Sequence, residues 1–311
     1  MKNIKWLLLM AVVLVLAACS LEQPGSKSSS DEKGEAGNEG EKAYKVGLSV
    51  STLNNPFFVT LSEGVKEQAK ESGSEVIVVD AQDDASKQAS DVEDLIQQGV
   101  DLLIINPTDS EAVVSAVESA NSSNIPVITV DRRAEGGEVV SHIASDNKAG
   151  GVLAGEYMIE LLGEDNPQVA ELEGIAGSSA ARDRGAGFNE AVDGKVNIVA
   201  KQTANFNRAE GLTVMENILQ ANPDIQGVFA HNDEMALGAL EAIQSAGKDI
   251  TVIGFDATDD AIKSVKDGKL SATIAQKPEE IGVKAMEAAV AMLNGEDVDA
   301  DIPVDLELIK E

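Results

Sequence analysis

The chain has 311 residues, of which 43% are hydrophobic, 25% are charged and only 3% are aromatic. This length is enough for one large core or for two of ordinary size. Its 24 Lys and Arg against 54 Asp and Glu give a formal net charge of −30, which opposes binding to nucleic acid. Such a charge favours solubility and weak self-association, so we expect a monomer.

Residues 1–18 have the composition of a secretory signal peptide. Lys2 and Lys5 precede an apolar run, Trp6–Val15, that is too short to span a bilayer as a stable helix. The following Leu16-Ala-Ala-Cys19 resembles the bacterial lipobox, in which the cysteine is lipidated and becomes the mature N-terminus. An ordinary signal with a chance cysteine is the alternative. However, Cys19 is the single cysteine of the chain and has no disulfide partner, so we expect a lipid anchor there.

Residues 19–43 are rich in Ser, Gly, Glu and Lys and contain almost no large apolar side chain. Such a segment cannot bury enough surface to offset its ordering entropy, and we expect a flexible tether. The folded part would then lie outside the cell, attached to the membrane surface.

After residue 43, apolar β-branched runs alternate with amphipathic segments of helical length, which predicts an α/β fold with parallel sheets. Strands are expected to begin at Lys45, Glu75, Leu102, Val127, Val140, Val169, Val196, Gly227, Thr251 and Ser271, with a last strand at Val304–Ile309. Helices are predicted at Pro56–Ser72, Ala85–Gln98, Asp109–Ser122, Asn147–Leu162, Arg208–Ala221, Asp233–Ala246 and Pro278–Leu293. So many strands favour two lobes, and the order of the elements alone places one boundary at Ile143–Asn147.

The segment Ser51–Phe58 joins the first strand to the first helix. Asn55 is a good N-cap, and Pro56 fits the first helical position. A capped helix with two core phenylalanines is the simpler interpretation, but adjacent Phe57 and Phe58 cannot both point along one helix face. At least one of them is therefore expected to line the crevice beyond the strand ends, where open α/β sheets bind ligands.

Polar residues follow the carboxyl ends of five predicted strands, namely Asn106, Asp131 with Arg132, Asn232, Asp256 and Gln276. Their amide, carboxylate and guanidinium groups can both donate to and accept from a ring of hydroxyl groups. Hydrogen bonds to charged groups contribute roughly 1.5–3 kcal/mol each, so the set suits a neutral polyol. Aromatic rings would cover the C–H faces of a sugar, and the candidates are Phe57, Phe58 and Phe206.

Each of these residues also has a simpler structural role. Asn and Asp are ordinary caps before helices, which would explain Asn106, Asp131, Asn232 and Asp256 one at a time. Arg184 would be a solvated helix-surface cation near Asp183, and Phe206 would be a core residue. The ligand-binding interpretation rests on the set as a whole.

Other chemistries have little support in the sequence. It contains neither a Walker A motif nor G-x-G-x-x-G, and Gly174–Ser179 is expected to be a turn before a helix. His142 and His231 are not at metal-ligand spacing and are expected to be structural. Asp297–Asp301 departs from a calcium loop and is expected to be a solvated charge run, so we expect no metal and no cofactor.

Six segments closely resemble the D-ribose-binding proteins of bacterial ABC importers, in the type I periplasmic binding protein family. The resemblance runs from about Tyr44 to the C-terminus, and the segments are Ser51–Val59, Ile105–Ser110, Ile125–Arg132, Val140–Asn147, Gly174–Gly185 and Asn232–Leu240. The family implies two similar lobes, each a parallel sheet with helices on both faces, joined by a three-segment hinge. Its pattern would place residues 44–145 and 277–305 in the N-terminal lobe, and residues 146–276 and 306–311 in the C-terminal lobe.

The resemblance also implies the ligand contacts, with the sugar closed between the lobes. Carried over by motif, they are Asn55, Phe57, Phe58, Asn106, Asp131, Arg132, Arg184, Phe206, Asn232, Asp256 and Gln276. None of these positions departs from the family's pattern. The N-terminus does depart from it, because a lipobox and tether replace a plain periplasmic signal, as is typical of a Gram-positive cell.

The family's role is not enzymatic: it captures D-ribose and delivers it to the permease of an ABC transporter, and in some cases to a chemoreceptor. Within this role, the alternatives are another pentose, allose or a furanose signalling molecule. A sugar-responsive regulator would need a basic helix-turn-helix before Tyr44, where this chain has an acidic tether. A secreted glycosidase, with Asp131 and Asp256 as its carboxylate pair, is the remaining alternative.

Overall fold

The computed structural model describes residues 43–163 and 165–310. The predicted signal peptide, Cys19 and all of the predicted tether except its last residue lie outside this range. Within the described range, no helix has the length and apolar character needed to cross a membrane.

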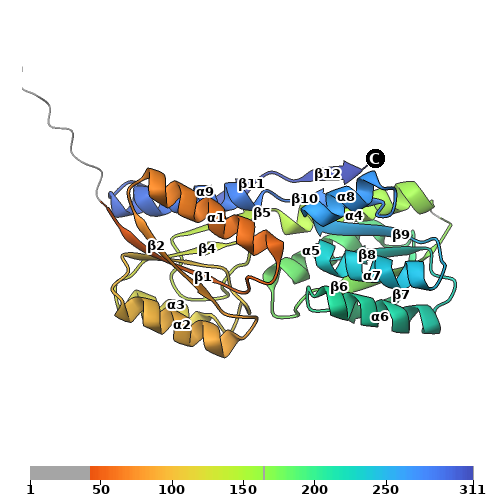
Figure 1. Ribbon diagram of the computed structural model, residues 1–311, viewed down its shortest axis with the longest axis horizontal. Helices are drawn as coiled ribbons and strands as arrows, with labels where there is room; N and C mark the ends of the chain where they lie inside the picture. Colours follow the sequence, from red (N-terminus) through yellow and green to blue (C-terminus); the bar gives the residue numbers. More distant parts are fainter. Residues whose placement is uncertain (1–42, 164, 311) are drawn as a thin grey trace, which may run out of the picture. The chain divides into compact units, whose positions relative to one another are not determined.

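Two six-stranded sheets form the framework of the protein (Figure 1). The first has the order β11-β5-β4-β3-β1-β2 and is parallel throughout; its strands are β1 (Lys45–Val50), β2 (Glu75–Asp80), β3 (Leu102–Ile105), β4 (Val127–Val130), β5 (Ser141–Ser145) and β11 (Asp301–Val304). The second has the order β12-β10-β9-β8-β6-β7, with only β12 antiparallel; its strands are β6 (Gln168–Glu173), β7 (Asn197–Thr203), β8 (Gly227–Ala230), β9 (Thr251–Asp256), β10 (Ala272–Ala275) and β12 (Glu307–Lys310).

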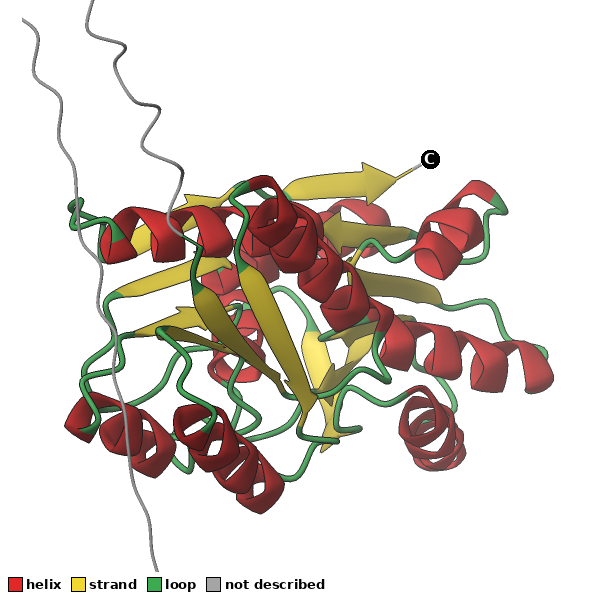
Figure 2. Cartoon of the chain, turned by 60° about the vertical axis from the view of Figure 1, so that its left-hand side comes forward, coloured by secondary structure: helices red, strands yellow, loops and turns green. Residues whose placement is uncertain are grey.

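Helices cover both faces of each sheet (Figure 2). They are α1 (Pro56–Glu71), α2 (Ala85–Gln97), α3 (Val114–Ser122), α4 (Asn147–Leu162), α5 (Ser179–Val192), α6 (Arg208–Ala221), α7 (Asp233–Ser245), α8 (Asp259–Lys266) and α9 (Pro278–Leu293). In the first lobe, α1 and α9 share one apolar core, and α2 and α3 share the other. In the second lobe, α4 and α5 pack on one face, and α6, α7 and α8 pack on the other. The predicted fold class is therefore confirmed.

Most predicted strands begin within one residue of the expected position, but the last predicted strand is wrong. Val304–Ile309 is not one strand, because β11 ends at Val304 and pairs with β5, whereas β12 starts at Glu307 and pairs with β10. The sequence of Val304–Ile309 gives no local signal of this change of pairing partner. Pro303 lacks an N–H, and β11 tolerates it because it is the edge strand of its sheet.

One helix also starts later than predicted. The α3 helix begins at Val114, because residues 109–113 form a separate turn. Asp109 stabilises that turn by accepting hydrogen bonds from the backbone N–H groups of Glu111 and Ala112, at 2.9 and 2.8 Å. The α8 helix, which lies between two predicted strands but is not among the clearest predicted helices, is the shortest of the described helices.

The chain passes between the two sheets three times: after β5, after β10, and between β11 and β12. The second passage brings α9 back to pack against α1, although more than 200 residues separate them in sequence. A single boundary at Ile143–Asn147 does not describe this path. The boundaries taken from the family pattern stay a prediction.

Glycines allow α1 and α9 to approach each other closely. A Cβ atom at Gly282 would lie 2.2 Å from the carbonyl oxygen of Leu61, and one at Gly64 would lie 2.4 Å from that of Glu279. Both obstacles are backbone atoms, which cannot move aside as a flexible side chain can. This contact attaches the returning segment to the first lobe.

We therefore predict that Gly282→Ala destabilises the protein by roughly 1–3 kcal/mol, because it forces two helix backbones apart. Alanine alone would favour a helix by about 1 kcal/mol, so the expected sign opposes helix propensity. Urea unfolding followed by circular dichroism measures the change. Glu287→Ala, at an exposed site on the same helix, is the matched control. Equal or greater stability of Gly282→Ala would show that the helices do not meet at this glycine.

Candidate functional site

Polar side chains from both sheets meet at the carboxyl ends of their parallel strands. Asp131 follows β4 in the first sheet, and Asp256 ends β9 in the second. The side chains that converge there enclose a small cavity, with about 220 Å³ not filled by protein atoms. Its lining comprises Asn55, Phe57, Phe58, Asp131, Arg132, Ala180, Arg184, Phe206, Asn232, Asp256 and Gln276.

Ten of the eleven predicted ligand residues line this cavity, and Asn106 lies behind it. Its side-chain oxygen accepts from the N–H of Ser51 at 3.2 Å, and its amide donates to the carbonyl of Val130 at 3.1 Å and to Asp131 Oδ2 at 3.4 Å. Asn106 thereby fixes the carboxylate that lines the cavity. That it touches a ligand directly stays a prediction.

The capping interpretation holds for only two of the asparagines and aspartates. Asn55 accepts from the N–H of Phe57 at 2.9 Å at the start of α1, and Asn232 accepts from the N–H of Met235 at 3.0 Å at the start of α7. Asn232 also donates to the carbonyl of Phe206 at 3.2 Å. Asp131 precedes no helix, and the residue before α8 is Thr258 rather than Asp256.

Three cavity residues have positive φ angles, which residues other than glycine rarely adopt. The φ angles are 62° at Asp131, 59° at Phe206 and 115° at Asp256. Left-handed conformations of non-glycine residues cost on the order of 1–3 kcal/mol each and persist where the surroundings hold them. Their concentration around one cavity indicates that the fold maintains these side-chain positions for a purpose other than stability.

Four buried charges line the cavity, two of each sign. Arg132 Nε lies 3.5 Å from Asp131 Oδ2, and Arg184 lies 3.6 Å from Asp256 and 3.9 Å from Asp131. Burial raises the pKa of Asp131 and of Asp256 above the ordinary value, and the arginines oppose that rise. Because these buried charges balance one another, a charged ligand would leave one of them unmatched.

Arg184 is not the solvated surface cation that its helical setting suggested. Only 3% of its surface is exposed. Its Nε donates to Asn147 Oδ1 at 2.8 Å, and its Nη1 donates to the carbonyl of His231 at 2.6 Å. The small residues around it in the sequence, Ala180, Ala181 and Gly185, were the available signal that this part of the helix is buried.

Aromatic rings complete the cavity wall. Phe57 and Phe58 meet edge to face, with ring centroids 5.1 Å apart, and both line the cavity. The guanidinium carbon of Arg132 lies 5.1 Å from the ring centres of both Phe58 and Phe206. Phe58 and Phe206 come from different lobes, so one cation joins two aromatic surfaces across the cavity.

Within the described part of the chain, three buried atoms in the cavity wall have no hydrogen-bond partner: Asp131 Oδ1, Arg132 Nε and Gln276 Oε1. Buried polar atoms are seldom left unpaired in proteins. Two of these atoms accept hydrogen bonds and one donates, which matches hydroxyl groups because a hydroxyl does both. The described residues include no cluster of His, Cys, Asp and Glu suited to a metal ion.

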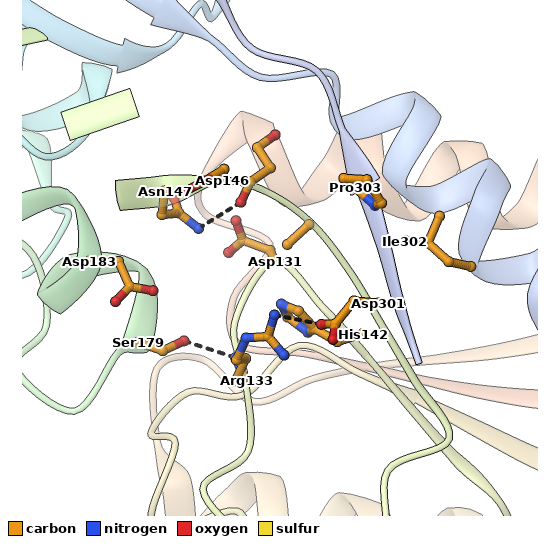
Figure 3. A pocket seen from close by; sticks show the side chains of 12 residues that line it. Asp131, Arg133, His142, Asp146, Asn147, Ser179, Asp183, Asp301, Ile302 and Pro303 are labelled. Carbon is orange, nitrogen blue, oxygen red and sulfur yellow. Dashed lines mark hydrogen bonds and ion pairs between the residues drawn. The ribbon is translucent and has the colours of Figure 1, made fainter. Parts of the chain in front are cut away.

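A larger, open cavity of about 980 Å³ lies beside this site (Figure 3). Asp131 lines both cavities. The open cavity contains an ion pair, Arg133 with Asp301 at 2.6 Å. Each of these two side chains is more than half exposed. Exposed pairs contribute little and remain hydrated, so the buried, charge-balanced cavity is the better ligand site.

The two lobes also contact each other directly beside the cavities. The N–H of Arg133 donates to Ser179 Oγ at 2.8 Å, as Figure 3 shows, and the N–H of Ser110 donates to the carbonyl of Gly177 at 2.9 Å. An ion pair joins Arg182 to Glu135. These contacts hold the lobes in the arrangement that encloses the cavity.

Comparison with known proteins agrees with this architecture. The ribose import binding proteins RbsB of Bacillus subtilis and Escherichia coli are each 56% identical to this chain; the first match covers 99% of both chains, and the second covers 85% of this chain and 90% of the relative. A solute-binding protein of Bacillus halodurans with bound myo-inositol has a TM-score of 0.81 at 34% identity, covering 88% of this chain and 96% of its own. One of Actinobacillus succinogenes with bound D-allose has a TM-score of 0.80 at 33% identity, covering 86% and 97%. The periplasmic binding protein domain family matches residues 46–297, and the chain belongs to this family.

Proposed function

We propose that this protein is an extracellular, membrane-anchored solute-binding protein that captures D-ribose between its lobes and delivers it to an ABC transporter permease. The observation that carries the proposal is the buried, charge-balanced cavity with one unpaired donor and two unpaired acceptors in its wall. The identity to ribose import binding proteins supports ribose as the ligand. The protein has no enzymatic role in this proposal.

The proposed ligand contacts come from both sides of the cavity. The first lobe supplies Asn55, Phe57, Phe58, Asn106, Asp131 and Arg132, and the second supplies Arg184, Phe206, Asn232, Asp256 and Gln276. The carboxylates and Gln276 would accept from sugar hydroxyls, and the arginines would donate to them. The phenylalanine rings would cover the C–H faces of the sugar.

The proposed lobes are residues 44–145 with 277–305, and residues 146–276 with 306–311. A ligand that touches both lobes stabilises the closed arrangement through contacts it lacks in an open one, so binding shifts a hinge equilibrium. The closed lobes would then present one continuous surface to the permease. A chemoreceptor could bind the same surface.

Related sugars are the alternative ligands, and a titration calorimetry panel separates them. The panel contains ribose, other pentoses, D-allose, myo-inositol and a furanose. Because a buried polar site rejects ligands that leave a member unpaired, we expect ribose to bind most tightly, by tenfold or more, which corresponds to about 1.4 kcal/mol. If another sugar of the panel bound more tightly, the ligand would be reassigned to that sugar. If no sugar of the panel gave a heat of binding, the proposal would be refuted.

Asn232 and Phe206 test the residue assignment. We predict that Asn232→Ala and Phe206→Ala each weaken ribose binding at least tenfold, because one lost hydrogen bond or stacked ring is worth about 1–3 kcal/mol. Asn232 also caps α7, so Asn207→Ala is the matched control: Asn207 caps α6 by accepting from the N–H of Glu210 at 3.1 Å, and it does not line the cavity. Calorimetry should show unchanged affinity for this control. Parental affinity in both test variants would refute the assignment.

The membrane anchor rests on the sequence around Cys19, which lies outside the described residues. We propose that Cys19 is lipidated and holds the protein on the outer face of the cytoplasmic membrane, in a Gram-positive cell. Cys19→Ala should then release most of the protein into the medium, because without its lipid the protein would have no other attachment to the membrane. Immunoblots of membrane and medium fractions measure this. A Cys19→Ala protein that stays with the membrane would argue against the lipid anchor.

A further inference from the structure

A buried, hydrogen-bonded pair of titratable side chains lies directly beneath the second-lobe side of the cavity. Glu171, in β6, has no exposed surface. Its Oε1 lies 2.8 Å from His231 Nε2, and its Oε2 accepts from Asn189 Nδ2 at 3.0 Å and lies 3.3 Å from Lys201 Nζ. Neither Glu171 nor His231 lines the cavity. The ligand contacts proposed above therefore do not account for this pair.

The hydrogen bonds of His231 fix its protonation. The backbone N–H of Gly174 donates to Nδ1 at 3.3 Å, so Nδ1 carries no proton. The proton of the neutral ring must then lie on Nε2, from which it is donated to Glu171. Burial lowers the pKa of His231, although Glu171 opposes that shift. His231 is therefore a neutral imidazole with one donor and one acceptor, both used.

Three cavity residues depend on the position of His231. Its carbonyl accepts from Arg184 Nη1 at 2.6 Å, and Asn232 is the next residue in the chain. Gly174, which His231 holds through Nδ1, lies against the ring of Phe206: a Cβ atom at this glycine would be 2.1 Å from the ring carbon Cζ. The imidazole therefore acts on Phe206 through Gly174, and by fixing the His231 side chain it fixes the backbone that carries the carbonyl bonded by Arg184 and leads into Asn232.

We propose that Glu171 and His231 are positioning residues for the ribose site, which hold Arg184, Asn232 and Phe206 in register with the sugar. This inference rests on the proposed function, because it concerns how the same cavity is shaped. The competing explanation is a buried pair that contributes only to folding. Such a pair can often be replaced by apolar residues of similar volume with little loss, whereas a positioning pair cannot be replaced without losing affinity.

Two substitutions at His231 distinguish these explanations. His231→Gln keeps an amide donor for Glu171 and an oxygen acceptor for Gly174, whereas His231→Leu keeps the volume and loses both. In ribose calorimetry at pH 7.5, we expect the dissociation constant of His231→Gln to lie within about threefold of the parent's. We expect His231→Leu to bind ribose about tenfold more weakly or worse, because it loses one or two hydrogen bonds. His142→Gln is the matched control. It changes the other of the two histidines, whose Nδ1 bonds Thr129, and should bind as the parent does.

The pH dependence provides a second readout. The charged groups that face the imidazole are Glu171, Glu173 and Arg184, with Lys201 beyond Glu171. Protonation would place a second donor opposite the N–H of Gly174, so affinity should fall as the pH drops below the ordinary histidine range. Asp131 and Asp256 also titrate, so the quantity compared is the difference between the parent and His231→Gln. This difference should grow from pH 7.5 to pH 5, since glutamine does not titrate.

Three results would overturn the positioning role: parental affinity in His231→Leu, equal loss in the glutamine and leucine variants, or a parent-to-glutamine difference that is constant with pH. If His231→Leu does not fold, nitrogen NMR of the ¹⁵N-labelled parent decides. The parent should show one neutral ring protonated at Nε2 at pH 7.5, and a ring protonated at Nδ1, or charged, would refute the proposal. Ribose binding by the parent in the same titration separates these outcomes from failure of the proposed function.

Discussion

The balance of two carboxylates and two guanidinium groups in one buried cavity is the constraint on which the rest of the structure depends. Each of these charges would be costly to bury alone, and they are tolerated because each arginine lies beside an aspartate of its own lobe and Arg184 also reaches Asp131 across the cavity. Arg184 illustrates the arrangement, since it reaches Asp131 of the first lobe and Asp256 of the second. The lobes are therefore electrostatically complementary to each other as well as to a polyol. A cavity of this kind selects for hydroxyl pattern and excludes ligands that carry charge.

The topology makes this balance possible. Parallel strands direct their carboxyl ends to one edge of each sheet, and the polar residues stand at those ends. The fold also holds Asp131, Phe206 and Asp256 at positive φ, at a cost to stability that a purely structural loop would avoid. Beneath them, the pairing of Glu171 with His231 supports the second-lobe wall from inside the sheet. The cavity is thus held from below as well as from its rim.

Much of the fold follows from periodicity, because buried parallel strands and amphipathic helices have clear patterns in this sequence. The errors occur where local pattern does not determine the partner. The segment Val304–Ile309 has the pattern of one strand, and only tertiary pairing divides it between two sheets. Arg184 reads as a surface cation, because the acceptors that make its burial tolerable come from distant segments. Asn106 reads as a cap or ligand contact, yet its hydrogen bonds place it behind Asp131. The strand ends and the aromatic residues supplied most of the ligand set, although capping explained several members equally well. Family resemblance added Asn55 and Arg184 as ligand contacts.

Only Asp305 and Leu306 separate β11 from β12, which belong to different sheets. So short a link has little conformational freedom, and two further strand-to-helix passages run beside it. The halves therefore cannot slide or twist far past each other, and the easiest relative motion left is bending about a single axis close to these passages. A protein built in this way returns its binding groups to the same register at every cycle, so recognition does not have to be reassembled each time it meets a sugar.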